Sequence, residues 1–400
     1  MGAGNSGREG PSAGVLEQKA SVLEGRLETL ARRGVTIVDP RQTFVGPEVD
    51  PRRICAGAIL HPGVRICGAR SFVGPAAEVG TEGPATIVNA MFGERARIAS
   101  GYVDGAVLLR DASLGGNAHV RGGTILEEEA STAHAVGLKQ TILLAFVTLG
   151  SQINFCDVLM AGGTSRRDHS EVGSGYIHFN FTPWGAKGDK ATPSLIGDVQ
   201  RGVLLRERRI FLGGSGGMIG PRRVGYGAIV GAGSILRSDV ADGHLMIQRG
   251  RQIDRELAAD YLDGLEPRRA RNLRYIGELV ALRAWYLGVR RPRIPGGEAH
   301  EHRRIVIDGA IANLELAIAE REKRLRDFAV ERGVGTISPA ALDEAPACPI
   351  DLGGEGSVDD HVAWVGGLAD AQVEALRAWL AGIVAGASLR RRAEGDGGPR

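Results

Sequence analysis

Apolar residues recur at every sixth position in three stretches of the first 240 residues. The clearest run contains Leu212, Met218, Val224, Val230 and Leu236. Two earlier runs keep the same interval: Ile54, Leu60, Ile66 and Phe72, and Leu108, Leu114, Val120 and Leu126. An amphipathic helix would repeat its apolar residues at i, i+3, i+4 and i+7, and a half-buried strand would alternate with period two. A period of six, with small residues beside the aliphatic one, is typical of a parallel β-helix whose coils bury these residues against one another.

Composition supports a solenoid. Sixty of the 400 residues are glycine, which is roughly twice the ~7% of an average protein, and a coil that turns every few residues needs such residues at its corners. The formal net charge of +2 is too small to indicate a nucleic acid or an anionic membrane as a partner. The four cysteines have no paired metal-ligand spacing, so we expect free thiols.

Changes of pattern divide the chain into five segments. Residues 1–14 are rich in glycine and serine and are expected to be disordered, and residues 15–34 have the spacing of a helix that ends at Gly34. The β-helix is expected over residues 35–250, with a loop excursion at 179–209 where prolines and polar residues interrupt the pattern. Amphipathic helical patterns fill residues 251–388, and 389–400 are expected to form a disordered tail. The chain has no long apolar run and no signal peptide at its start, so we expect a cytoplasmic protein without a membrane span.

Four segments carry a resemblance to a known family: ARRGVTIVDP (residues 31–40), EVGSGYIHFNFTP (171–183), FLGG (211–214) and GAIVGAGSILRSDV (227–240). With them, residues 15–250 resemble the acetyltransferase half of the bacterial bifunctional N-acetylglucosamine-1-phosphate uridyltransferase and glucosamine-1-phosphate acetyltransferase. The resemblance implies a left-handed parallel β-helix, a homotrimer, and active sites at subunit boundaries for an amino-sugar phosphate and acetyl-coenzyme A. Only some fifteen residues precede the expected helix, so we do not expect nucleotidyltransferase activity from this chain.

The position of the family's catalytic histidine is occupied by another residue. In the family, this histidine takes a proton from the sugar amine as the amine attacks the thioester. An ungapped count back from Asn180 places the position at Asp157, and a second register places it at Gln152. A carboxylate with a pKa near 4 is a poor base for an ammonium group unless burial raises that pKa.

The richest cluster of polar residues is the segment 162–181. Arginine offers a bidentate fork for phosphate and histidine can supply a base, so we expect one phosphate-binding loop from residue 162 to 190. A solvated loop with one hydrogen-bonded histidine is the alternative.

The candidate catalytic residues are Asp157, His169 and His178. The candidate substrate-binding residues are Lys139, Arg166, Arg167, Asn180 and Lys190, of which Lys139, Asn180 and Lys190 follow from the resemblance. The resemblance also assigns Gly214, Ala232 and Arg249 to acetyl-CoA or another acyl-CoA, and no metal is expected because His169, Asp168 and His178 match no familiar ligand spacing.

The sequence leaves two functions open. The first is an acyltransferase-like protein that binds or acylates an amino-sugar phosphate or nucleotide sugar of the UDP-N-acetylglucosamine pathway. The second is a non-catalytic trimeric platform for binding or assembly, derived from the same fold. The missing histidine favours the platform, and the dense polar segment favours ligand binding.

Overall fold

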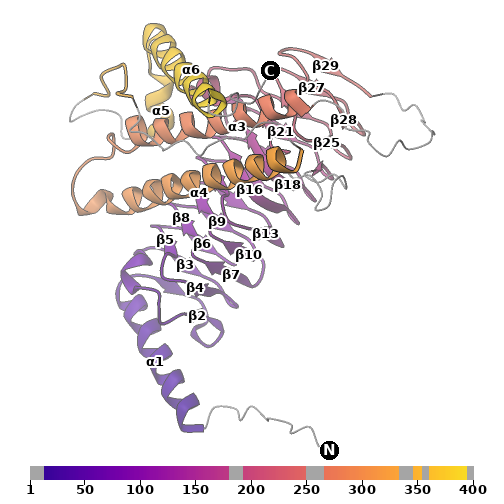
Figure 1. The fold of residues 1–400 in the computed structure, drawn as a ribbon. Helices are drawn as coiled ribbons and strands as arrows, with labels where there is room; N and C mark the ends of the chain where they lie inside the picture. Colours follow the sequence, from indigo (N-terminus) through magenta and orange to yellow (C-terminus); the bar gives the residue numbers. More distant parts are fainter. Residues whose placement is uncertain (1–12, 180–191, 249–264, 333–345, 354–359, 394–400) are drawn as a thin grey trace, which may run out of the picture.

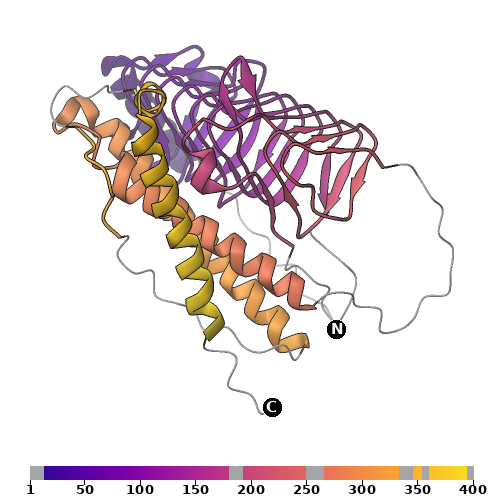
Figure 2. The ribbon, with the colours of Figure 1, turned by 90° about the horizontal axis from the view of Figure 1, so that it is seen from above.

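A parallel β-solenoid with helices along one side forms the protein (Figure 1). The computed structural model describes residues 13–179, 192–248, 265–332, 346–353 and 360–393. Seen from above, the C-terminal helices run together along one flank of the coils (Figure 2). Each short strand of the coils pairs in parallel with the strand one coil away. The predicted fold class, a left-handed β-helix with an N-terminal helix and a C-terminal helical region, is confirmed.

Each coil contributes strands to three walls. Wall 1 contains β1 (Thr36–Ile37), β3 (Ile59–Leu60), β6 (Glu78–Val79), β9 (Arg97–Ile98), β12 (Ser113–Leu114), β15 (Ser131–Thr132), β17 (Thr148–Leu149), β21 (Glu171–Val172), β24 (Phe211–Leu212), β27 (Ile229–Val230) and β29 (Leu245–Met246). Wall 2 contains β2 (Phe44–Val45), β4 (Arg65–Cys67), β7 (Ala85–Val88), β10 (Gly101–Asp104), β13 (Ala118–Val120), β22 (Ile177–Phe179), β25 (Gly217–Ile219) and β28 (Ile235–Leu236). Wall 3 contains β5 (Phe72–Val73), β8 (Met91–Phe92), β11 (Val107–Leu108), β14 (Ile125–Leu126), β23 (Ser194–Ile196) and β26 (Arg223–Val224). Two longer strands, β16 (Gly137–Leu143) and β18 (Asn154–Met160), turn the corner from wall 2 to wall 3.

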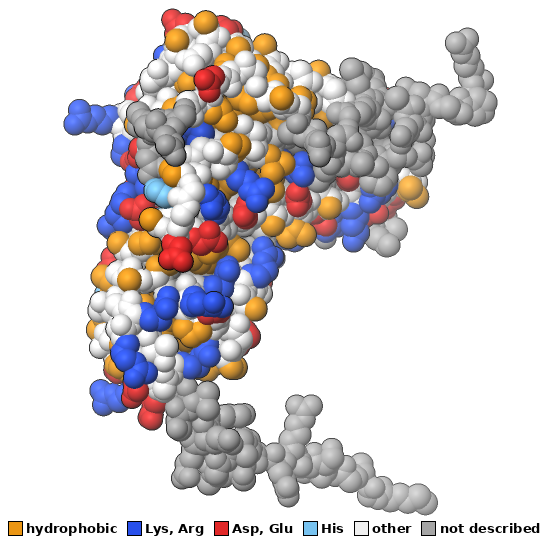
Figure 3. Space-filling view, turned by 90° about the vertical axis from the view of Figure 1, so that its left-hand side faces the viewer, with side chains coloured by type: hydrophobic (Ala, Val, Ile, Leu, Met, Phe, Trp, Pro, Cys, Tyr) orange, Lys and Arg blue, Asp and Glu red, His pale blue; other side chains and the backbone are white. Residues whose placement is uncertain are grey.

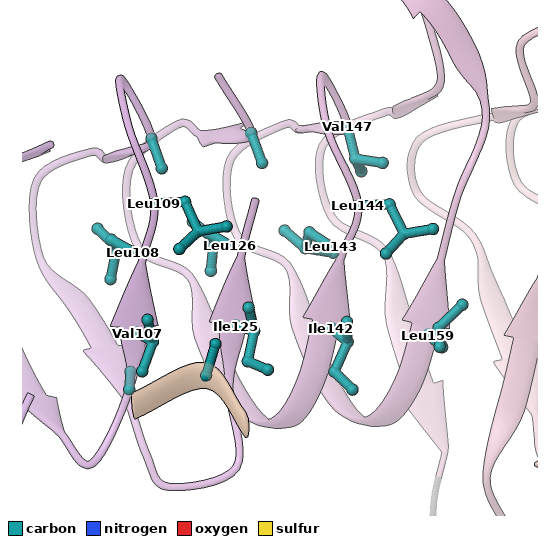
Figure 4. Packing of buried hydrophobic residues seen from close by; sticks show 14 of the residues in the cluster. Val107, Leu108, Leu109, Ile125, Leu126, Ile142, Leu143, Leu144, Val147 and Leu159 are labelled. Atoms are coloured by element: carbon teal, nitrogen blue, oxygen red, sulfur yellow. The ribbon is translucent and has the colours of Figure 1, made fainter. Parts of the chain in front are cut away.

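The core of the solenoid is a set of aliphatic ladders. All thirteen residues of the six-residue pattern are at most 2% exposed, as predicted. Figure 4 shows one ladder on wall 3, in which Leu108, Leu126 and Leu143 occupy the same place in successive coils. Such stacking brings each side chain into contact with its counterparts one coil above and below, which is why the repeat specifies the fold.

Two insertions interrupt the coils near residues 160–210. The hairpin β19 (Gly163–Ser165) and β20 (Asp168–His169), between walls 3 and 1, was not predicted as an excursion. The loop excursion predicted at 179–209 is divided, because β23 lies within that range and pairs with β18 and β26. Residues 180–191 fall outside the described part of the chain, and the short helix α2 (Val199–Gly202) follows β23.

The helices that flank the solenoid agree with the amphipathic patterns of the sequence. They are α1 (Ala13–Arg32), α3 (Leu265–Trp285), α4 (Glu301–Arg332), α5 (His361–Gly366) and α6 (Asp370–Ala393), with the π-helix η3 (Tyr286–Arg290) and the 3₁₀ turns η1 (Pro40–Gln42), η2 (Pro51–Arg53) and η4 (Glu298–His300). Helix α1 covers the first coils, where Leu27 and Leu30 are buried. The predicted division of the chain into five segments stays a prediction.

Helix α4 covers the outer face of wall 3. Both residues of each of the strands β5, β8, β11 and β14 are buried, whereas most wall 1 strands bury only one residue of two. The helix approaches so closely at Gly309 that a Cβ there would collide with Met91 Sδ. Asn313 Nδ2 donates hydrogen bonds to Gly105 O at 2.8 Å and Thr124 O at 3.2 Å. Wall 3 is therefore buried on both faces, and α4 is fixed to it by apolar and polar contacts.

Two buried glutamates fasten the helical region to the solenoid. Glu127 accepts a hydrogen bond from Tyr286 Oη at 2.8 Å and lies 3.2 Å from Arg290 Nη1. Glu278 Oε2, in α3, accepts a hydrogen bond from the backbone N of Val199 at 2.9 Å. Burial raises the pKa of each carboxyl group to about 7, because the charged form loses its hydration.

We predict that Val224→Asp destabilises the protein by at least about 3 kcal/mol, because it buries an unpaired carboxylate in a ladder. Thr36→Asp is the control, since Thr36 is exposed on the outer face of wall 1 in the first coil and should tolerate the change with a loss of about 1 kcal/mol or less. Urea unfolding measures both variants. Equal destabilisation by the two variants would contradict the inward orientation of Val224.

We predict that the contribution of Glu278 to stability falls as the pH rises through about 7. The folded state holds this proton more tightly than the unfolded state, so the contribution is fully present below the ordinary carboxyl pKa and is lost as the carboxyl ionises. Glu278→Gln keeps an acceptor and cannot ionise, so its stability relative to the wild type should rise by up to about 3 kcal/mol from acid to alkaline pH. Urea unfolding of both proteins across this range checks it, with the exposed Glu374→Gln as control. If the free energies of unfolding of the wild type and Glu278→Gln change with pH in the same way, the raised pKa of Glu278 is excluded as a cause of pH-dependent stability.

Candidate functional site

A groove of about 630 Å³ runs between the outer face of wall 2 and helix α4. Three candidate residues of the sequence analysis, Lys139, Asp157 and His178, line it. The other lining residues are Arg121, Asn154, Cys156, Ile177, Phe179, Glu320, Arg321 and Arg324. The solenoid and the helical region of the same chain thus form the two sides of one polar groove.

Lys139 and Arg121 form a cationic pair on the solenoid side of the groove. Lys139 lies in β16, and Arg121 follows β13 in the preceding coil. The backbone N of Arg121 donates to Leu138 O at 2.8 Å, so Arg121 stands beside Lys139 across one inter-strand spacing of ~4.8 Å. Arg121 is exposed and Lys139 is half-buried, and both are accessible to a ligand. Arg121 was missed by the sequence analysis, although its spacing of one coil from Lys139 was a usable signal.

Asp157 lies at the corner between walls 2 and 3. Its backbone has a φ of 62°, in the left-handed region. Asn89, Gly123 and Gln140 occupy the same corner in other coils and also have a positive φ. Its side chain is buried, and Oδ1 lies 3.0 Å from Nη2 of Arg321 in α4. Asp157 therefore links the solenoid to α4, and its carboxylate is already engaged by a guanidinium.

His178 points into the solenoid rather than into the groove. It is 3% exposed and stands in register with Met218 of the aliphatic ladder. Its Nδ1 lies 2.6 Å from Cys156 O, which can only accept, so Nδ1 carries the proton; Nε2 lies 2.8 Å from Ser194 Oγ. Burial lowers its pKa to about 4, so the ring is neutral near neutral pH. Because both nitrogens are engaged, this geometry gives His178 a structural role.

The Cys156 thiol is a poor nucleophile in this setting. Burial raises its pKa, and the neighbouring Asp157 raises it further. The thiol form therefore dominates near neutral pH, and the groove offers binding groups in preference to a covalent catalyst.

Arg166, Arg167 and His169 of segment 162–181 lie elsewhere on the solenoid. Arg166 anchors the β19–β20 hairpin at the corner between walls 3 and 1, since its Nη1 donates to Glu129 O and Phe146 O, each at 3.0 Å. His169 Nδ1 lies 3.0 Å from Arg166 O in the same hairpin, and the Arg167 side chain is exposed. The coil strands β21 and β22 lie along the chain between this hairpin and the residues beyond 179, so the segment from 162 to 190 is not one continuous loop; that it binds a phosphate stays a prediction.

Two candidate coenzyme residues, Gly214 and Ala232, lie at the corner between walls 1 and 2 of the last coils. A Cβ at Gly214 would lie 2.7 Å from Ser174 O, so the packing of adjacent coils requires glycine there. Ala232 follows β27 at the same corner one coil later and is exposed. Asn180, Lys190 and Arg249 lie outside the described residues.

Gln152, the alternative position for the base, lies next to a histidine. Its φ is 59°, and its backbone N donates to His134 O at 3.0 Å in the preceding coil. The Oγ of Ser151 lies 3.0 Å from His134 Nδ1. His134 is exposed, so this corner of wall 2 presents an imidazole one coil away from the predicted position.

No known family model matches the chain. Curated relatives do match it. The chain is similar to proteins named bifunctional protein GlmU. That of Fervidobacterium nodosum is 31% identical over 242 residues, which are 60% of this chain and 48% of the relative. Those of Thermotoga petrophila and Nocardia farcinica are each 29% identical, over 58% and 56% of this chain and 46% and 40% of the relatives.

The similarity to GlmU proteins confirms the resemblance read from the sequence, and the parallel solenoid is consistent with their acetyltransferase half. The chain spans about half the length of the curated relatives it matches. Among the helices described here, none has the length and apolar character needed to cross a bilayer. Within the same described residues, no three metal-ligating side chains are grouped to hold an ion.

Proposed function

We propose that the chain is an acyltransferase-like protein that binds an amino-sugar phosphate, or the corresponding nucleotide sugar, in the groove between wall 2 and α4. The observation that carries this proposal is the pair Lys139 and Arg121, which presents two cations in adjacent coils. A phosphoryl group is stabilised by charge-assisted hydrogen bonds from such donors. Asn154, exposed in the same groove, offers an amide that can orient sugar hydroxyl groups.

The similarity to GlmU proteins supports acetyl-CoA or another acyl-CoA as the second ligand. We place it near Gly214 and Ala232, corner residues of the last coils of which Ala232 is exposed and Gly214 is half-buried. His134 is the proton acceptor we propose for acyl transfer, because it is exposed and its Nδ1 is oriented by Ser151. If the chain acylates the sugar, His134→Gln should lower kcat while the affinity for the sugar phosphate is retained.

A non-catalytic platform is the second candidate function. The engagement of Asp157 by Arg321 favours it, since this ion pair removes the carboxylate from the role of a base. Release of free thiol from acetyl-CoA, measured with glucosamine-1-phosphate as acceptor, separates the two functions. Turnover abolished by His134→Gln supports the enzyme; ligand binding without turnover supports the platform.

We predict that Lys139→Ala and Arg121→Ala each weaken binding of glucosamine-1-phosphate by on the order of 1–3 kcal/mol, because each removes a charged donor from the phosphoryl group. Isothermal titration calorimetry measures the affinity. Lys323→Ala is the matched control, since Lys323 is exposed on α4 and does not line the groove. An unchanged affinity in both groove variants, with unchanged melting temperatures, would remove the groove as the site.

We also propose that the chain forms a homotrimer. The last coils expose apolar side chains in one column of wall 1, where Phe211, Ile229 and Leu245 are in register and 39%, 49% and 66% exposed. Ile177 and Phe179 add exposed apolar surface on wall 2. Contiguous apolar patches of this kind mark protein–protein contacts.

We predict a trimer by light scattering at micromolar concentration, and dissociation when Leu245 is replaced by Glu, because the substitution places a charge in the apolar contact. Ser113→Glu is the control, since Ser113 lies in the outward column of wall 1 several coils away. A wild-type chain that is a stable monomer at this concentration would exclude the trimer.

A further inference from the structure

A second cavity lies where the helical region meets the solenoid, separate from the wall 2 groove. It encloses about 70 Å³, a volume suited to a small ion rather than a sugar. Its solenoid side is the turn that leads from wall 3 to wall 1, and its other side is the end of η3 with the starts of α4 and α5. On this face, charged side chains of both signs lie close together about halfway up the molecule (Figure 3).

The arginines that line this junction cavity include two that pair with carboxylates outside its lining, Arg110 with Asp111 and Asp360, and Arg290 with Glu127. Four arginines line it, Arg110, Arg290, Arg293 and Arg303, with the two glutamates Glu94 and Glu128. The guanidinium of Arg293 stacks on Trp364, 3.9 Å from the ring centroid, so its orientation is fixed. Arginines held in place in a partly enclosed cavity favour a multivalent anion, since their donors need little reorganisation to meet it.

Two histidines add neutral donors to the cavity. Burial holds the pKa of His361 well below its usual value, and the surrounding arginines, including Arg290 and Arg293, lower it further. Its Nδ1 lies 3.3 Å from Arg293 Nη1 and accepts from that guanidinium, so Nε2 carries the remaining proton. Burial likewise lowers the pKa of His302. Around His361 the arginines act together with burial to keep the ring neutral.

The side chain of Glu128 indicates which kind of anion the cavity would bind. Its Oε1 is bound by Arg290, and its side chain is 6% exposed. Its Oε2 is buried without a hydrogen-bond partner among the described residues. A buried carboxylate oxygen that accepts no hydrogen bond is costly, so an anion that also carries a proton would be favoured in this cavity.

We propose that the junction cavity binds inorganic phosphate as hydrogen phosphate, with the arginines on its charged oxygens and its hydroxyl group donating to Glu128 Oε2. Hydrogen phosphate is the small oxyanion that combines a double negative charge with a proton near neutral pH. Sulfate has no proton to donate, and a phosphomonoester has lost most of its own above its second pKa of ~6. Glu128 would therefore select inorganic phosphate over both and would couple its binding to the docking of the helical region.

The test uses the full chain carrying Lys139→Ala and Arg121→Ala, so that the groove does not contribute. Calorimetry and thermal unfolding at about pH 7.5 compare sodium phosphate, sodium sulfate and methyl phosphate at equal ionic strength. We expect phosphate to bind at one site and raise the melting temperature, because a ligand of the native state stabilises it, and the other two anions to bind at least about tenfold more weakly. Adding Glu128→Gln should reduce this selectivity, because the amide NH₂ can donate to sulfate.

Arg110→Gln supplies a variant that does not depend on the buried Glu128 ion pair, since the Arg110 side chain is 25% exposed. It should weaken phosphate binding by about tenfold. Arg41→Gln, whose side chain is 90% exposed, should leave binding unchanged. Absence of phosphate binding, or equal binding of phosphate and sulfate by the parent chain, would overturn the proposal.

Discussion

The burial of wall 3 beneath α4 determines where the polar chemistry of this protein lies. A solenoid wall normally has an outer face in water, but here both faces of β5, β8, β11 and β14 are apolar and enclosed. A helix laid on such a wall cannot follow it around the corners, so polar side chains fill the space at its two edges. At one edge the space becomes the groove around Lys139, and at the other it becomes the junction cavity around Glu128.

The buried charges are concentrated at these two edges for the same reason. Arg321 meets Asp157 at the corner between walls 2 and 3, and Arg290 meets Glu127 and Glu128 at the turn from wall 3 to wall 1. A buried ion pair contributes little net stability compared with apolar packing, but it disfavours every arrangement that would leave one charge unpaired. The aliphatic surface of wall 3 thus supplies the affinity of the helix for the solenoid, and the ion pairs at its edges fix its position.

The sequence predicted what depends on a local repeat and missed what depends on tertiary contact. The six-residue interval predicted inward positions such as Leu60, Leu108 and Leu236, because the same packing repeats in each coil. Phe72 is the exception, since it stands in register with Met91 on the face toward α4. His178 looked like a candidate base because of its polar neighbours, although its strand alternates and Met218 stands beside it in the ladder. The cavity around Glu128 could not be predicted, because Arg290 lies more than 160 positions away and helical periodicity does not reveal which surface a helix covers.

Wall 2 itself suggests how a sugar phosphate would lie if the chain transfers an acyl group. Lys139 stands near the corner with wall 3, and His134 precedes the same strand at the corner with wall 1. Five Cα–Cα steps with a bend at Ala135 separate them, at most about 17 Å, which a sugar phosphate and an extended lysine side chain can span together. A ligand held by its phosphoryl group at Lys139 and Arg121 would point its sugar along the strand toward the imidazole. The acyl donor would then have to approach from the corner of the last coils, where Gly214 and Ala232 lie.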